Sequence, residues 1–237
     1  MQNIAAQLNL SETAFLTRTS DTDSTFEIRY FTPTTEVPFC GHATLAAACV
    51  CIEELNHSSV QFITQSREHL SARITASDSF LLNFPLYKNV AHEVDVKLLD
   101  AMGISNPSQT RLCEELKMLL IEIDTLEELQ TVSPDYTAMI EATNAYQEVV
   151  VTSRTAGTEY DFQSRCFCPW IGINEDPVTG AAHAVLAPYW SERLNQIKFD
   201  AYQCSTRGGS MHLELLPDSL KVVADAQIVL RGTMELA

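Results

Sequence analysis

The residues of this 237-residue chain best suited to acid–base chemistry lie near two similar glycine turns and near the N-terminus. His42 directly follows Gly41, Asp176 precedes Gly180 by four residues, and Glu12 lies in the sequence Asn-Leu-Ser-Glu-Thr. Carboxylates and imidazoles can accept and return protons near neutral pH when burial or neighbouring charges shift their pKa values. These residue types therefore favour acid–base catalysis.

Each of the three residues also has a structural interpretation. Glu12 can cap or solvate a turn, His42 can be a hydrogen-bonded core histidine, and Asp176 can be the N-cap of the helix that follows it. The adjacent acids Glu175 and Asp176 are less ordinary, because buried carboxylates cost free energy unless they have partners. The residues alone leave both kinds of role open.

Both glycine turns lead into alanine-rich segments, residues 45–55 and 184–194. A helix that is apolar on all sides is normally buried, so each segment predicts a central helix. The first turn of a helix carries unpaired N–H groups and the positive end of the dipole, and glycine lets a ligand approach the backbone. Two such helices entering from opposed halves would favour a small anion between them, most simply a carboxylate.

The similarity of the two turns indicates two related α/β halves. We expect residues 1–88 to form the N-terminal half, 89–223 the C-terminal half, and 224–237 a C-terminal strand that can return to the first half. Apolar periodicity predicts the remaining elements. Helices are expected at 1–8, 45–55, 94–102, 125–132, 134–142 and 184–194, and strands at 14–17, 26–31, 60–63, 70–74, 80–84, 116–123, 148–152, 198–202, 211–215 and 228–230.

Composition excludes several classes of function. The chain has 15 Lys and Arg against 31 Asp and Glu, a net charge of −16, which disfavours nucleic acid and anionic membrane surfaces. It has no apolar run of about 18 residues and no signal-peptide pattern, so we expect a cytoplasmic protein. Its seven cysteines include no Cys-x-x-Cys pair, which favours buried thiols and no metal site.

Four segments resemble the phenazine-biosynthesis PhzF-like family, which has the diaminopimelate-epimerase-like fold. Residues 89–148 resemble it mainly in pattern. The resemblance implies an α+β fold of two pseudo-symmetric domains, each a curved mixed β-sheet wrapped around a central buried helix, with the active site between them and a homodimer as the assembly. The four segments are MQNIAAQLNLSETAFL, FTPTTEVPFCGHATLAAA, YDFQSRCFCPWIGINEDPVTGAAHAVLAPYW and CSTRGGSM.

The resemblance also implies roles for individual residues. By position, Glu12 corresponds to the acid–base carboxylate of the family, and His42 and Asp176 to the other polar active-site residues. The implied activity is a cofactor-independent isomerisation that moves a proton on a small cyclic or amino carboxylic acid. The implied substrate-binding residues are Cys40, Gly41, Thr179, Gly180, Ala181, Arg207, Gly208 and Gly209.

Two departures from the family pattern leave an alternative open. Ala181 stands where many members have serine, and the family normally has a strand and a Gly-Asn-Pro loop before the Met-Gln motif with which this sequence starts. We therefore also expect that the N-terminal half lacks this piece, and the alternative is a truncated or non-catalytic carboxylate-binding member. A racemase with one cysteine at each helix start is disfavoured, because Thr179 stands at the position that matches Cys40.

Overall fold

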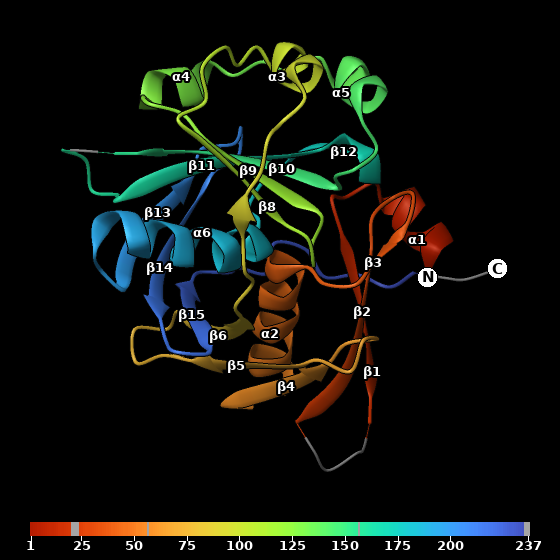
Figure 1. Cartoon of the computed structure of the whole chain (residues 1–237). Helices are drawn as coiled ribbons and strands as arrows, with labels where there is room; N and C mark the ends of the chain where they lie inside the picture. Colours follow the sequence, from red (N-terminus) through yellow and green to blue (C-terminus); the bar gives the residue numbers. More distant parts are fainter. Residues whose placement is uncertain (20–23, 56, 156, 235–237) are drawn as a thin grey trace.

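The computed structural model describes residues 1–19, 24–55, 57–155 and 157–234, and it shows a mixed α+β protein (Figure 1). The helices are α1 (Gln2–Leu8), α2 (Gly41–Leu55), α3 (Val96–Met102), α4 (Leu126–Thr131), α5 (Tyr136–Ala142) and α6 (Gly180–Leu194), with the 3-10 helix η1 (Pro169–Ile171). The strands are β1 (Thr13–Arg18), β2 (Thr25–Phe31), β3 (Glu36–Val37), β4 (Ser59–Ile63), β5 (His69–Ile74), β6 (Phe80–Pro85), β7 (Val90–Ala91), β8 (Gln109–Cys113), β9 (Met118–Glu122), β10 (Glu148–Arg154), β11 (Phe162–Cys168), β12 (Ile173–Asp176), β13 (Lys198–Gln203), β14 (Gly209–Leu215) and β15 (Ser219–Ala224).

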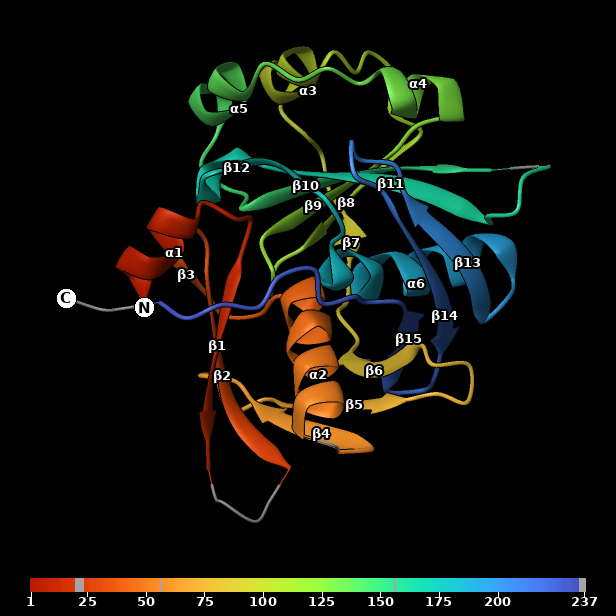
Figure 2. The same cartoon turned by 180° about the vertical axis from the view of Figure 1, so that it is seen from behind.

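In the first half, helix α2 contacts strands β1, β4, β5 and β6 (Figures 1 and 2). Its inward face carries small side chains, and Ala43, Ala47 and Ala48 are all buried. Small side chains let the strands approach the helix closely, and the strands supply the bulk of the core through large residues such as Phe62 and Leu82. The alanine-rich segment is therefore a central buried helix, as its composition predicted.

In the second half, helix α6 is the central element. Its Trp190 stacks on Phe162 of β11, with ring centroids 5.6 Å apart. Pro188 lacks an N–H, so the carbonyl of Ala184, four residues earlier, has no partner in a regular helix. The backbone N–H of Tyr87, in the connection after β6, donates to that carbonyl at 3.5 Å. A proline inside α6 thus ties this helix to the chain that joins the two halves.

A second layer covers the outer face of the C-terminal sheet. Strands β9 and β10 pair in parallel and are apolar on both faces, as is usual for a strand covered on both sides. Leu120 and Val150 belong to the core that surrounds the two central helices, whereas Leu119 and Val151 pack into a separate core with helices α3, α4 and α5. These three helices lie together on the side of the sheet away from α6 (Figure 1).

Strand β15 joins the two halves into one sheet. It pairs antiparallel with β6 of the first half and with β14 of the second, so the hydrogen-bonded order runs from β1 through β6, β15 and β14 to β7. Residues 86–89 form neither helix nor strand, and the expected boundary at residue 88 lies among them. The predicted fold class, two helix-centred halves with curved mixed sheets, is confirmed.

The predicted strand at 228–230, within the expected C-terminal strand 224–237, is wrong for the residues the structure describes. Strand β15 ends at Ala224, and residues 225–234 form neither helix nor strand, while 235–237 lie outside the described residues. Val229 and Leu230 are 89% and 85% exposed, so their apolar side chains contribute little to the core. A strand needs a neighbouring backbone to pair with, and an apolar run alone does not supply one.

This C-terminal segment does lie against the first half. Arg231 forms an ion pair with Glu54 of α2 at 2.6 Å, and the Cys49 thiol is 3.9 Å from the carbonyl oxygen of Ala226. Among the described residues, no helix is both long and apolar enough to cross a membrane.

Candidate active site

The two central helices meet at their first residues, Gly41 and Gly180. A Cβ atom placed on Gly41 would lie 2.6 Å from the Cα of Gly180, and one placed on Gly180 would lie 2.8 Å from the Cα of Gly41. Such distances are far inside van der Waals contact, and the obstacle is backbone that no side-chain rotation can move. Glycine is therefore required at both positions, because the two helix N-termini touch each other.

Folding brings Glu12, His42 and Asp176 together at this meeting point. Glu12 precedes β1, His42 is the second residue of α2, and Asp176 ends β12. His42 Nε2 lies 2.8 Å from Glu12 Oε2, and His42 Nδ1 lies 3.9 Å from Asp176 Oδ2. The side chains of Glu12 and Asp176 are only 7% and 6% exposed, which is far below the norm for carboxylates. The sequence predicted all three residues for one site, and their geometry places them in contact.

The orientation of the His42 ring follows from a backbone contact. Nδ1 donates a hydrogen bond to the carbonyl oxygen of Val178 at 2.8 Å, because a carbonyl can only accept. This contact crosses from the first half of the chain to the second. With the Nδ1 proton held there, Nε2 faces Glu12 and can accept or donate a proton in its direction.

Burial and charge shift the pKa values at the site. Burial raises the pKa of Asp176 to about 6, with the neighbouring His42 lowering it and Glu12 raising it. Burial alone would lower the pKa of His42, but Cys40, Glu12 and Asp176 raise it well above its usual value. A carboxylate with a pKa near 6 next to a cationic imidazole is well suited to exchange protons close to neutral pH.

Two carboxylate oxygens at the site lack partners. Within the described ranges, neither Glu12 Oε2 nor Asp176 Oδ1 has an aligned hydrogen bond, although Glu12 Oε2 is close to His42. The other oxygen of Asp176, Oδ2, accepts a hydrogen bond from the Thr179 hydroxyl. Buried polar atoms are nearly always satisfied in folded proteins, so unpartnered carboxylate oxygens at one point are typical of a ligand site.

Glu148, the first residue of β10, is an acid of this site that sequence reasoning missed. The Cys166 thiol donates to its carboxylate at 3.8 Å, and Cys166 is in register with Asp176. Burial, together with the negative charges of Asp176 and Glu12, raises the pKa of Glu148 to about 8. Its only signal in the sequence was a carboxylate at the start of a buried apolar strand.

Cys40, the residue before Gly41, lies against the His42 imidazole, whereas Thr179, the residue before Gly180, contacts Asp176. Cys40 Sγ is 3.6 Å from His42 Nε2, and burial raises the pKa of this thiol to about 12. Thr179 uses its hydroxyl to hold Asp176. The two helix starts therefore do not present a pair of thiols.

Gln203 and the loop after β13 support the second helix start. Gln203 donates to the carbonyl of Asp176 at 2.8 Å and accepts from the backbone N–H of Thr179 at 2.7 Å, which fixes the turn before α6. Gly208 adopts a φ of +68°, and Gly209 packs so closely on Val178 that a Cβ would lie 2.5 Å from its methyl group.

The remaining predicted binding residues differ in position. Ala181 is buried at the second residue of α6, where it offers a methyl group and no hydroxyl. Arg207 is exposed and forms no ion pair within the part of the chain that the structure describes. The structure therefore brings Gly41, Gly180, Cys40, Thr179 and Ala181 to the site and leaves Arg207 outside the cluster of charged groups.

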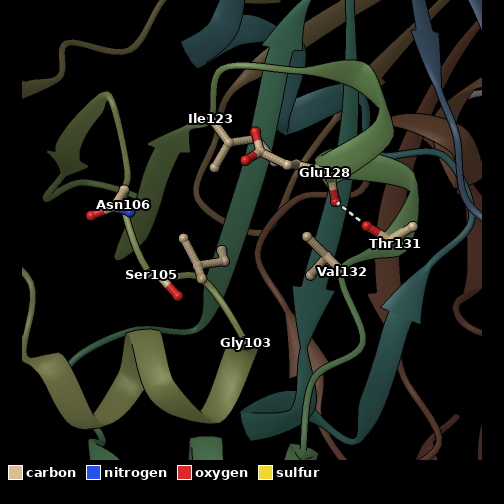
Figure 3. A pocket seen from close by; sticks show the side chains of 8 residues that line it. Gly103, Ser105, Asn106, Ile123, Glu128, Thr131 and Val132 are labelled. Atoms are coloured by element: carbon tan, nitrogen blue, oxygen red, sulfur yellow. Dashed lines mark hydrogen bonds between the residues drawn. The ribbon is translucent and has the colours of Figure 1, made fainter.

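Space at the site is small. An apolar cavity of about 30 Å³ is lined by Gly41, His42, Val178 and Gly180, among others, which is room for about one water molecule. A larger pocket, of about 170 Å³, lies at the surface between the end of α3 and helix α4 (Figure 3). Its only titratable side chain, Glu128, caps α4 by accepting from Thr125, so we do not assign chemistry to it.

The fold is shared with a solved structure of a protein named a predicted epimerase. The structure of a predicted epimerase from Pseudomonas aeruginosa has a TM-score of 0.77, covering 100% of this chain and 88% of that chain. The two sequences are 20% identical, so this likeness shows the fold alone.

Closer relatives define the family. The family described as phenazine biosynthesis-like protein (PhzC-PhzF) matches residues 1–233. The chain is 41% identical to an uncharacterised isomerase of Halalkalibacterium halodurans, over 100% of this chain and 87% of that protein. A crystal structure of a PhzF family protein from Enterococcus faecalis is 34% identical with a TM-score of 0.86, covering 99% of this chain and 86% of that one. The chain belongs to the PhzF family of phenazine biosynthesis-like proteins.

Proposed function

We propose that this protein is an isomerase that moves a proton within a small cyclic or amino carboxylic acid, without a cofactor. The observation that carries this proposal is the contact of Glu12 and His42 with Asp176 nearby, where two helix N-termini meet. The relative from H. halodurans is named an isomerase, which supports this class of reaction.

Glu12 is the group that takes the proton from carbon and returns it to another carbon of the substrate. Its side chain is only 7% exposed, and its Oε2 atom lies 2.8 Å from His42 Nε2, so Glu12 is a desolvated carboxylate paired with an imidazole. His42, held by the carbonyl of Val178, orients Glu12 and stabilises its charge. Asp176, with a pKa of about 6, positions the substrate or takes up charge that develops on it.

The substrate carboxylate binds at the two helix starts. The N–H groups of the first turn of each helix have no partner within the helix, and both helix dipoles direct positive potential to this point. Gly41 and Gly180 let the two helix ends approach each other closely, so that the first-turn N–H groups of both helices can act on one anion. Because the cavity at His42 holds only about 30 Å³, binding requires the two halves or their side chains to move apart.

The experiment that tests the proposal has two stages. Small cyclic and amino carboxylic acids are first screened by thermal unfolding, where a ligand at a hundred times its Kd adds about 2.7 kcal/mol. Acids that bind are then incubated with the protein and followed by NMR for a positional or stereochemical isomer. Binding without conversion of any bound acid would support a carboxylate-binding protein and contradict the isomerase.

Replacing Glu12 by Gln is expected to lower the rate of isomerisation by about 10²–10⁴, because the proton acceptor is lost while the shape is kept. Affinity for the acid should change little. The matched control is Glu127→Gln, a change of the same kind at an exposed position of α4. An unchanged rate in Glu12→Gln would show that another group moves the proton.

A homodimer and a cytoplasmic location stay predictions. The molar mass in solution, measured by light scattering on the purified chain, tests the first, and fractionation of the source cells tests the second.

A further inference from the structure

Cys40 has a thiol, a group that can act as a nucleophile or bind a metal ion, and the proposed reaction does not use it. It lies within the site together with Glu12 and His42, and one ligand atom from each of the three falls within 4.8 Å of the others. The sequence predicted no metal site, because the seven cysteines form no Cys-x-x-Cys pair and were interpreted as buried thiols. The third ligand, Glu12, reaches them only through the fold.

The histidine is already oriented as a metal ligand. A metal-bound imidazole commonly donates its other N–H to a carbonyl or carboxylate, which fixes the ring and the tautomer. Here His42 Nδ1 donates to the carbonyl of Val178 at 2.8 Å, and Nε2 faces Glu12 Oε2 at 2.8 Å. The outer contact that a metal site needs is therefore present.

The spacing of the ligand atoms suits a small tetrahedral ion. Cys40 Sγ is 3.6 Å from His42 Nε2, and a tetrahedral zinc ion with ordinary bond lengths would place a sulfur and a nitrogen ligand about 3.5 Å apart. The sulfur is also 3.7 Å from Nδ1, so the Cys40 side chain would turn toward the Nε2 side of the ring to bind the same ion. Glu12 Oε2, 2.8 Å from Nε2, would move outward by about 0.5 Å to reach the same arrangement. One thiolate, one imidazole and one carboxylate form a donor set that favours Zn²⁺ over Mg²⁺ or Ca²⁺.

The buried carboxylate of Glu12 is a second observation that favours a bound ion at this point. Glu12 has a side chain only 7% exposed, and its Oε2 atom lacks an aligned hydrogen bond among the residues that the structure covers. Its near neighbour is His42 Nε2 at 2.8 Å, and a cation bound between the two atoms would coordinate both.

We propose that Glu12, Cys40 and His42 bind one Zn²⁺ ion through Oε2, Sγ and Nε2, and that the bound ion blocks the site. Cys40 gives up its thiol proton to solvent when the sulfur–zinc bond forms, and the fourth coordination position is left to water or to a substrate carboxylate. The binding is independent of the proposed function. The inhibition depends on the proposed function, because zinc would occupy Glu12, the carboxylate that is to move the proton.

The test uses the purified full chain, freed of metal, with Co²⁺ and Zn²⁺ as probes. Co²⁺ bound by a thiolate gives a sulfur-to-metal charge-transfer band in the near ultraviolet, and a chromogenic chelator reports zinc affinity by competition. We expect one ion per chain, and Cys40→Ser should abolish the charge-transfer band and weaken zinc binding at least about tenfold. The matched control is Cys204→Ser, which removes a free, partly buried thiol elsewhere and should change neither reading.

Three outcomes would overturn the proposal: no zinc bound at micromolar concentrations, a charge-transfer band that survives Cys40→Ser, or a band that is lost in Cys204→Ser. Thermal unfolding of the metal-free variants shows whether Cys40→Ser folds, and Glu12→Gln provides a second variant that should weaken zinc binding while keeping the thiolate band. The screen with carboxylic acids is done on metal-free protein, so the isomerase proposal and the zinc proposal are tested separately.

Discussion

Helices α2 and α6 both begin at a glycine, but the side chains beside the two glycines differ. At the first, Cys40 and His42 flank Gly41, and the imidazole reaches Glu12. At the second, Thr179 and Ala181 flank Gly180, and the threonine hydroxyl is used to hold an aspartate.

The comparison teaches that the two halves share the task of positioning, while the first half carries most of the reactive groups. Gly41 and Gly180 are equivalent, because each must leave room for the backbone of the other. The side chains next to them are under no such mutual restriction, so each half can specialise. The anion site that we propose at the two helix ends would survive this divergence, because it depends on backbone N–H groups and not on side chains.

The largest effect should come from breaking the contact shared by the two starts. Gly41→Ala would place a methyl group 2.6 Å from the Cα of Gly180, and we expect a loss of about 3 kcal/mol in the free energy of unfolding, measured in urea. Gly232→Ala, where no atom lies within 4 Å of the added carbon, is the control and should change stability by less than about 0.5 kcal/mol. Equal stability of the two variants would mean that the helix ends are not in contact.

A second prediction concerns the acids that come from the second half. Burial raises the folded-state pKa of Glu148 from 4.5 to about 8, so its contribution to stability is fully present below pH 4.5 and is lost as the pH rises through 8. Glu148→Gln removes this loss. We expect the variant to gain on the order of 2 kcal/mol relative to wild type between pH 5 and pH 9, measured by urea unfolding across that range.

The control for this prediction is Glu127→Gln, whose carboxylate is exposed on α4. Its stability relative to wild type should not vary with pH. If Glu148→Gln behaved in the same way, the pKa of Glu148 would not be raised in the folded protein, and Glu148 would not be coupled to Asp176 and Glu12.

The smallest expected effect tests whether the second start binds the anion. Ala181→Ser adds a hydroxyl at the second residue of α6 and should strengthen the binding of a carboxylic acid by about 1 kcal/mol, roughly fivefold in Kd. The measurement is calorimetric titration with any acid found in the screen. Ala46→Ser, at an exposed position of α2, is the control and should leave Kd unchanged.

Sequence patterns located the two central helices closely and most of the strands. They succeeded where burial is a local property, as in the alanine-rich segments that became α2 and α6. They missed β15 and placed a strand at 228–230 instead. Both segments contain apolar residues typical of a strand, but only β15 has neighbouring strands with which to pair. One of these is β6, more than 130 residues earlier in the chain, and a local pattern cannot indicate that pairing.

Some residues of the candidate site were predicted from the sequence and others were not. Glu12, His42 and Asp176 were predicted from residue types near glycine turns and from resemblance to a family. Glu148 was missed, because one carboxylate before an apolar strand is not distinctive, and it matters only through its distance from the other acids.

The sequence by itself determined the residue types, the two glycine turns and the family to which the chain belongs. Only the tertiary structure decided that Gly41 and Gly180 touch, that the Val178 carbonyl sets the His42 ring, and that Cys40 shares a point in space with Glu12 and His42. The physical reason is that pKa values, hydrogen bonds and metal coordination depend on distances of a few ångströms between groups. The chain order leaves those distances open until the two halves pack against each other.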